Sequence, residues 1–227
     1  MMMFEIDVAP FALSGVVYTA LLNDPDATAS LGDAVVQAPY KALPVHPVLG
    51  LKPRNSLAWG DAEVAVPSDV VSLAMGPTLA VVIGRPACRL APDEAISVIA
   101  GYGVANDISI PVQSHYRPAL RQRVRDGFCV LGTQVVPADR IASPDGLRVR
   151  LSVDGRHIHT ATTGARVRNV ARLLSDVTAF MTLHPGDIVL LGAAHGAPTA
   201  RAGQRVEIEI EGVGGLTHRL VAGEGEQ

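Results

Sequence analysis

The sequence predicts a β-rich α+β fold with a few short helices, and three observations support this. The chain contains 22 glycines and 16 prolines, spread along its length. These residues interrupt regular elements, so the elements should be short and joined by many turns. Several stretches alternate between apolar and polar residues, as half-exposed strands do, whereas few stretches carry helix signals.

Four segments carry the strand signals. Leu79–Gly84 is continuously apolar and ends in glycine, so we expect a strand buried on both faces. Leu147–Val153 alternates strictly, and the Asp-Gly pair that follows it is a hairpin signal. Val206–Glu211 also alternates, and Asp187–Gly192, which follows a Pro-Gly turn, should form another core strand.

Two segments carry the helix signals. Between Val167 and Met181 the apolar residues recur at three- and four-residue steps, which predicts one amphipathic helix. Pro92–Ile99 opens with a proline and two acidic residues, which suit the positive end of a helix dipole. We therefore expect a second, shorter helix there.

Composition limits the number of domains and the kind of partner. The chain has 227 residues, of which 48% are hydrophobic, enough for one substantial core. Its formal net charge is −3, so no global basic field argues for nucleic acid. We therefore expect one main domain, no nucleic-acid partner and a small-molecule ligand whose charge is met by a local cluster.

Compartment signals favour the cytoplasm. Acidic residues lie near the N-terminus, where a secretory signal would carry Lys or Arg. No apolar run approaches the ~20 residues needed to span a bilayer, so we expect no membrane partner. Cys88 and Cys129 are the only cysteines and sit among apolar residues, so we expect reduced, buried thiols.

Two neighbouring motifs carry the functional signal. Gly101–Ser109 is an apolar segment closed by an Asn-Asp pair, and Arg125–Gly132 contains an Arg-Asp-Gly-Phe turn. An arginine-rich segment separates them, so a carboxylate and several guanidiniums should lie near one another. Guanidiniums bind carboxylates through two parallel hydrogen bonds, which indicates an enzyme that acts on a small anion.

The order of these pieces resembles the fumarylacetoacetate hydrolase superfamily. The resemblance runs from about Lys52 to Leu220 and also includes Leu51–Ser56, Leu183–Gly192 and Val206–Gly214. It implies a mixed β-sandwich roll. We expect residues 1–45 to form an N-terminal arm or small subregion and residues 46–227 to form the fumarylacetoacetate hydrolase-like domain.

Within the superfamily, three segments most resemble the N-terminal half of the bifunctional isomerase/decarboxylase of 4-hydroxyphenylacetate (homoprotocatechuate) degradation. They are Ala38–Ala42, Lys52–Asn55 and Tyr116–Ala119. The resemblance implies an isomerase or decarboxylase acting on 5-oxopent-3-ene-1,2,5-tricarboxylate or 2-hydroxyhepta-2,4-diene-1,7-dioate. The implied partners are a small polycarboxylate substrate and a homologous C-terminal subunit or a second copy of the chain.

The family's metal site is incomplete in this sequence. The resemblance implies a divalent ion held by a Glu-x-Glu at the head of the buried strand and by the Asp of the Asn-Asp pair. Here the strand head is Gly76-Pro77-Thr78, so only Asp107 is left at a ligand position. One carboxylate binds Mg²⁺ poorly unless substrate oxygens complete the shell, so we expect no tightly bound cofactor.

We assign hypothetical roles to the surviving polar residues, on the premise that the chain is catalytic. Arg123, Tyr116 and His195 are the predicted catalytic residues: Arg123 takes the position of a family lysine, and Tyr116 delivers a proton. The predicted substrate-binding residues are Lys52, Arg54, Arg117, Arg125 and Asp126, with Arg121 nearby.

Structural alternatives accompany these roles. The arginines from Arg117 to Arg125 also suit a solvated face or a subunit contact. In these alternatives Asp107 accepts hydrogen bonds from turn amides at a strand end, Lys52 forms a salt bridge at a strand end, and His195 is a loop residue without a catalytic role.

Two further functional alternatives stand beside the isomerase/decarboxylase subunit. The first is a catalytically silent scaffold that pairs with a metal-bearing homologue, which the missing glutamates favour. The second is a stand-alone acylpyruvate hydrolase, which needs a water-activating His-Glu pair that residues 22–26 do not supply.

Overall fold

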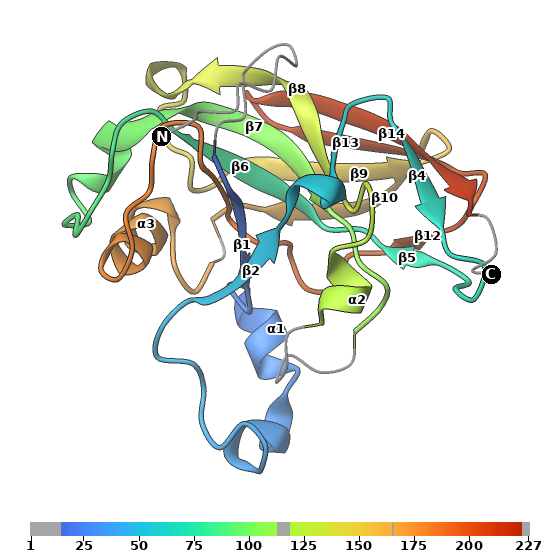
Figure 1. The fold of residues 1–227 in the computed structure, drawn as a ribbon, viewed down its shortest axis with the longest axis horizontal. Coiled ribbons are helices and arrows are strands. Elements are labelled where there is room, and N and C mark those ends of the chain that lie inside the picture. The colour runs from blue at the N-terminus through green and yellow to red at the C-terminus, as the bar shows by residue number, and fades with distance from the viewer. Residues whose placement is uncertain (1–14, 113–118, 165, 224–227) are drawn as a thin grey trace.

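Two β-sheets packed face to face organise the chain, and the computed structural model describes residues 15–112, 119–164 and 166–223 (Figure 1). The larger sheet has seven strands in the order β2-β1-β11-β6-β7-β8-β3. Its strands are β1 Val17–Leu21, β2 Val48–Lys52, β3 Leu57–Trp59, β6 Pro77–Ile83, β7 Ile99–Asp107, β8 Cys129–Pro137 and β11 Ile188–Leu190.

The smaller sheet has five strands in the order β10-β9-β13-β14-β4. They are β4 Glu63–Val66, β9 Arg148–Val153, β10 Arg156–Thr162, β13 Arg205–Ile210 and β14 Gly214–Ala222. Two short strands, β5 Leu73–Ala74 and β12 Thr199–Ala200, form a separate ribbon. Parallel pairs occur beside antiparallel ones, for example β1 with β11 and β4 with β14, so the sheets are mixed.

The larger sheet must curl. Its edge strands, β2 and β3, are separated in the chain only by Pro53–Ser56. In a flat sheet six gaps of about 4.8 Å would put the edges roughly 29 Å apart. The connection from Lys52 to Leu57 spans at most roughly 17 Å. The two edges therefore approach each other, and one face of the sheet becomes the inside of a half-barrel.

Few helices cover this framework. The α-helices are α1 Pro25–Ala29, α2 Leu120–Arg123 and α3 Val170–Thr178, and the 3₁₀ turns are Gly32–Val36, Arg54–Ser56, Ala95–Val98 and Ala138–Arg140. Figure 1 shows α1 and the segment after it projecting away from the two sheets. None of the described helices is long and apolar enough to cross a membrane.

Two hydrophobic clusters hold the layers together. The larger one fills the space between the two sheets and α3, and includes Leu79, Leu151 and Leu173. The smaller one lies on the other face of the large sheet and includes Leu131 and Ile188. The predicted β-rich roll is thus confirmed, together with its four predicted strands.

The two predicted helices differ from the observed ones. Residues 92–99 form no α-helix, because Ile99 pairs with Ile83 across β6 and β7 and the Val98 carbonyl accepts the Gly84 N–H. The helix predicted between Val167 and Met181 is α3, which begins only at Val170, because the Asn169 side chain caps it.

Two other expectations concern the cysteines and the N-terminal arm. Cys129 is buried, as expected, and burial raises its pKa to about 12, whereas Cys88 is exposed, which corrects the prediction for that thiol. Strand β1, which belongs to the predicted N-terminal arm, lies inside the large sheet between β2 and β11. Part of that arm is therefore joined to the main sheet.

Candidate active site

A cavity of about 330 Å³ opens at one end of the curled sheet. Its walls come from the end of β1, from α1, from the segment before β6, and from the end of β7, the end of α2 and the loop after β11. Three residues proposed from the sequence, Asp107, Arg123 and His195, line it together. The hydroxyl residues Ser109 and Thr199 also lie in the lining. Segments far apart in the sequence thus converge on one small, polar site.

Asp107 is the last residue of β7, and its carboxylate is almost completely buried. Its Oδ2 atom accepts a hydrogen bond from the Thr19 hydroxyl at 2.6 Å. Its Oδ1 atom lies 2.5 Å from the Lys52 ammonium nitrogen. Oδ2 therefore accepts a hydrogen bond, whereas Oδ1 forms the ion pair with Lys52 and no hydrogen bond.

Lys52 is the last residue of β2 and is 2% exposed. Besides Asp107, its Nζ contacts the carbonyl oxygens of Ile108 at 3.3 Å, Arg123 at 2.8 Å and Phe128 at 3.1 Å. An ammonium group has three N–H donors, so protein oxygens satisfy all of them. This geometry favours the salt-bridged strand end over a direct contact between Lys52 and substrate.

The head of β6 leaves no room for the family's first metal-binding glutamate. A Cβ atom added to Gly76 would lie 2.3 Å from the carbonyl oxygen of Asp107. Thr78 occupies the second glutamate position and is buried. Among the residues that the structure describes, no three His, Cys, Asp or Glu side chains gather as a metal site would require. The donor set around Asp107 therefore does not fit a divalent cation.

Arg123 and His195 approach the cavity from different elements. Arg123 ends α2 and is half-buried. His195 belongs to the glycine-containing loop after β11 and is exposed at the rim. A guanidinium in the wall and an imidazole at the rim suit an anionic substrate that also exchanges a proton.

The other predicted site residues lie elsewhere. Arg54 begins a 3₁₀ turn and is exposed, and Arg125 donates from its Nε to the Arg121 carbonyl at 3.2 Å. Asp126 accepts from the Asn55 side chain at 2.9 Å, which is turn chemistry. These three do not contribute to the described lining of the cavity.

Tyr116 and Arg117 fall outside the described residues. Their predicted roles, like that of Arg54, stay predictions.

A larger groove, of about 780 Å³, lies over the outer face of the smaller sheet. Its lining mixes Arg148 and Arg150 with Glu207 and Glu209, and Arg150 lies opposite Glu209 in the register of β9 and β13. Opposite charges on facing strands neutralise one another and suit a solvated sheet face. The smaller cavity is therefore the candidate active site.

Comparison with known proteins agrees with this architecture. The family described as fumarylacetoacetate (FAA) hydrolase C-terminal matches residues 16–221. The chain belongs to the fumarylacetoacetate hydrolase family. This membership confirms the superfamily assignment made from the sequence motifs.

Similar proteins include enzymes of aromatic-acid breakdown. The chain is 34% identical to the 4-hydroxyphenylacetate degradation bifunctional isomerase/decarboxylase of Escherichia coli, over 92% of this chain and 48% of that protein. It is 28% identical, with a TM-score of 0.79, to 5-carboxymethyl-2-hydroxymuconate delta-isomerase from Mycobacterium smegmatis, covering 93% of this chain and 80% of that one.

A second solved structure is equally similar in sequence. This is 2-hydroxyhepta-2,4-diene-1,7-dioate isomerase from Mycobacterium marinum, at 28% identity and a TM-score of 0.74, covering 92% of this chain and 75% of that chain. The chain spans about half the length of the bifunctional relatives it matches.

The structure adds a buried pair that the sequence reasoning missed. Asn106 Nδ2 lies 2.8 Å from His218 Nε2, and Asn106 Oδ1 accepts the Gly76 N–H at 2.7 Å. His218 is fully buried, and burial lowers its pKa to about 4, so it is neutral at neutral pH. The pair fixes the backbone of Gly76 in the cavity wall. No local signal links Asn106 to a residue 112 positions away.

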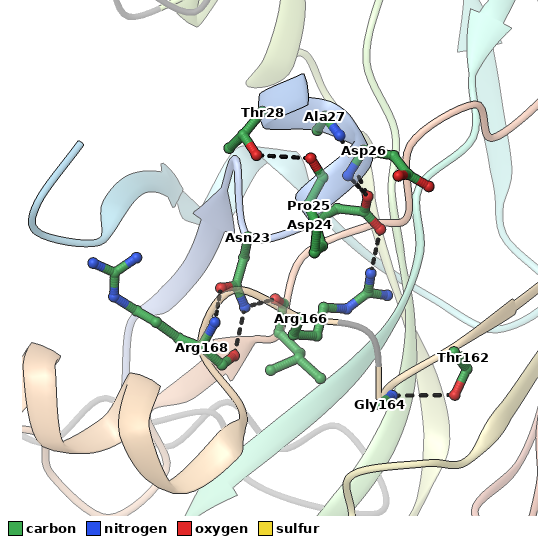
Figure 2. A network of polar contacts seen from close by, with 11 residues as sticks. Asn23, Asp24, Pro25, Asp26, Ala27, Thr28, Thr162, Gly164, Arg166 and Arg168 are labelled. Carbon is green, nitrogen blue, oxygen red and sulfur yellow. Dashed lines mark hydrogen bonds and ion pairs between the residues drawn. The ribbon is translucent and has the colours of Figure 1, made fainter. Parts of the chain in front are cut away.

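Figure 2 shows a second missed network, around Asn23 and Asp24. Asn23 Nδ2 donates to the carbonyls of Leu191 and Arg168, both at 2.9 Å, and its Oδ1 accepts the Arg168 N–H at 2.8 Å. Asp24 caps α1 and accepts from the Arg166 guanidinium at 2.7 Å. The network therefore anchors two walls of the cavity, α1 and the loop that carries His195.

The cap in this network had a signal in the sequence, because Asp followed by Pro is typical of a helix start. The Arg166 partner had none, since it lies 142 residues further along the chain.

Proposed function

We propose that this chain is a subunit of an isomerase/decarboxylase of aromatic-acid degradation. Its substrates would be 5-oxopent-3-ene-1,2,5-tricarboxylate or 2-hydroxyhepta-2,4-diene-1,7-dioate. The observation that carries the proposal is the convergence of Arg123, His195 and Asp107 on one cavity. The similarity to the bifunctional enzyme and to the two mycobacterial isomerases supports the substrate class.

The chemistry of such substrates matches the residues present. Decarboxylation of the tricarboxylate breaks the bond between C2 and its carboxylate and releases CO₂. The bonding electrons pass through the conjugated double bond to the C5 oxo oxygen as a dienolate, and a proton taken up on that oxygen gives 2-hydroxyhepta-2,4-diene-1,7-dioate. Charge therefore develops on the carbonyl oxygen, and fixed cationic donors stabilise it. Isomerisation through a dienol passes through the same kind of enolate.

Arg123 is the proposed carboxylate and enolate donor, because its planar fork forms two parallel hydrogen bonds with such a group. His195 is the proposed proton carrier at the rim, together with the predicted proton donor Tyr116. Ser109 and Thr199 supply further hydroxyl donors in the lining. Asp107 is engaged by Lys52 and Thr19, so its proposed role is to hold the wall.

A specific observation favours a second candidate, the catalytically silent scaffold. The chain matches only about half of its bifunctional relatives, and among the described residues the acidic donors of an active metal site do not gather around Asp107. In that case a homologous, metal-bearing partner carries the reaction and this chain supports it.

One assay separates the two candidates. The chain is purified alone and together with a homologous partner subunit, and the ultraviolet absorbance of the conjugated tricarboxylate is followed with each preparation. Turnover by the lone chain supports the enzyme, and turnover only in the mixture supports the scaffold.

A pair of variants tests the residue assignment in the same assay. Arg123→Ala should lower kcat/KM by roughly 100-fold, as expected for loss of an electrostatic donor. Arg156→Ala, an exposed arginine on β10, is the matched control and should leave the rate unchanged. An unchanged rate in Arg123→Ala would rule out the proposed role of Arg123.

A further inference from the structure

We infer that the Lys52 ammonium is the resident cation of this cavity. It neutralises Asp107 at the position where the family's metal-dependent members hold a divalent ion. The observation behind this inference is the 2.5 Å contact between Lys52 Nζ and Asp107 Oδ1, with both side chains almost fully buried. Buried charges of this kind are retained when they are paired and hydrogen-bonded.

The remaining lone pairs near Asp107 cannot build a shell for Mg²⁺ or Mn²⁺. Mg²⁺ takes about six oxygen ligands in near-ideal octahedral geometry, and one or two carboxylates usually anchor it. Here one carboxylate oxygen is held by Lys52 and the other by the Thr19 hydroxyl. A side chain at position 76 would collide with the Asp107 carbonyl. An ion placed on Oδ1 would also face the positive ammonium at close range, and like charges repel.

The same ammonium organises the wall that binds substrate. Its contacts with the Ile108, Arg123 and Phe128 carbonyls join the end of β7, the end of α2 and the start of β8. Lys52 therefore fixes the backbone of Arg123, a residue that lines the cavity. It acts as a positioning residue, and the anion-binding wall forms without a metal.

The chain offers a direct test, because it contains only two lysines, Lys41 and Lys52. Lys41 is exposed and serves as the internal control. Protein labelled with ¹³C-lysine gives one Cε–H signal from each lysine. The Lys41→Met variant lacks the Lys41 signal and so shows which signal belongs to Lys52. Mn²⁺ is then added to the metal-free protein, since a bound paramagnetic ion broadens signals close to it.

We expect the Lys52 signal to keep its intensity relative to Lys41 as Mn²⁺ rises to about 1 mM, the range of weak protein sites. Selective loss of the Lys52 signal at substoichiometric Mn²⁺ would overturn the inference. Asp107→Asn should move the Lys52 signal and leave Lys41 in place, whereas an unmoved Lys52 signal would also overturn it.

If Asp107→Asn does not fold, the Mn²⁺ titration of the wild-type chain still shows whether a divalent ion binds close to Lys52. The experiment uses no substrate, so its outcome is independent of whether the proposed reaction is correct.

Discussion

Replacing Lys52 with Met should destabilise the chain strongly, and the structure sets the magnitude. The substitution keeps much of the side-chain length but leaves the Asp107 carboxylate buried without its counter-ion. Breaking one side of a buried ion pair costs about 3–5 kcal/mol. The variant also leaves the carbonyls that Lys52 contacts with fewer donors. We therefore expect the free energy of unfolding to fall by about 4 kcal/mol.

Asp107→Asn should cost about 3 kcal/mol by the same reasoning, because the ammonium then lacks its counter-ion. In the double variant neither charge is left alone, so the two losses should not add. We expect a coupling free energy of about 3 kcal/mol from the double-mutant cycle.

Urea unfolding followed by fluorescence of Trp59, the single tryptophan, measures all four proteins. Lys41→Met, at an exposed position, should change stability by less than about 0.5 kcal/mol. Losses for the two single variants that add fully in the double variant would refute the reasoning.

Three further predictions test the surroundings of the cavity. The pKa of His218 is about 4 in the folded state, below the ordinary histidine value of 6.5, so the unfolded chain binds more protons between those values. Stability should therefore fall by about 3 kcal/mol as pH drops from 7 to 4, and His218→Gln should remove that part of the slope in urea titrations. Gly76→Ala should lower the melting temperature, because its Cβ would meet the Asp107 carbonyl, whereas Gly60→Ala has ordinary contact distances and should be near neutral. Equal melting temperatures for the two alanine variants would contradict this. Asn23→Ala removes three hydrogen bonds at a buried site and should cost about 2–3 kcal/mol in thermal or urea unfolding, and a loss under ~0.5 kcal/mol would count against its anchoring role.

The strands could be predicted because their signals are local. The apolar run from Leu79 to Gly84 contains most of β6, whose residues are all buried. The alternating run before the Asp-Gly hairpin became β9, and β10 follows the turn. The expected helix at residues 92–99 failed because pairing between Ile99 and Ile83 outweighs a weak helix-start signal.

The site could be predicted only in part. The order of the motifs identified Asp107, Arg123 and His195 as candidate site residues, and all three line one cavity in the structure. The role of Lys52 depends on three carbonyls from separate segments, which no sequence pattern reveals. His218 was missed for the same reason, since its partner lies on a distant strand.

Titration calorimetry with tricarballylate, a stable tricarboxylate, in the presence of EDTA tests the central claim most directly. The claim is that this cavity binds polycarboxylates through its own fixed cations. We predict that the wild-type chain binds tricarballylate without added metal and that Arg123→Ala weakens binding by at least roughly tenfold, the loss expected for a charged hydrogen bond. Binding that appears only when Mg²⁺ or Mn²⁺ is supplied, or that is unaffected by Arg123→Ala, would contradict the account.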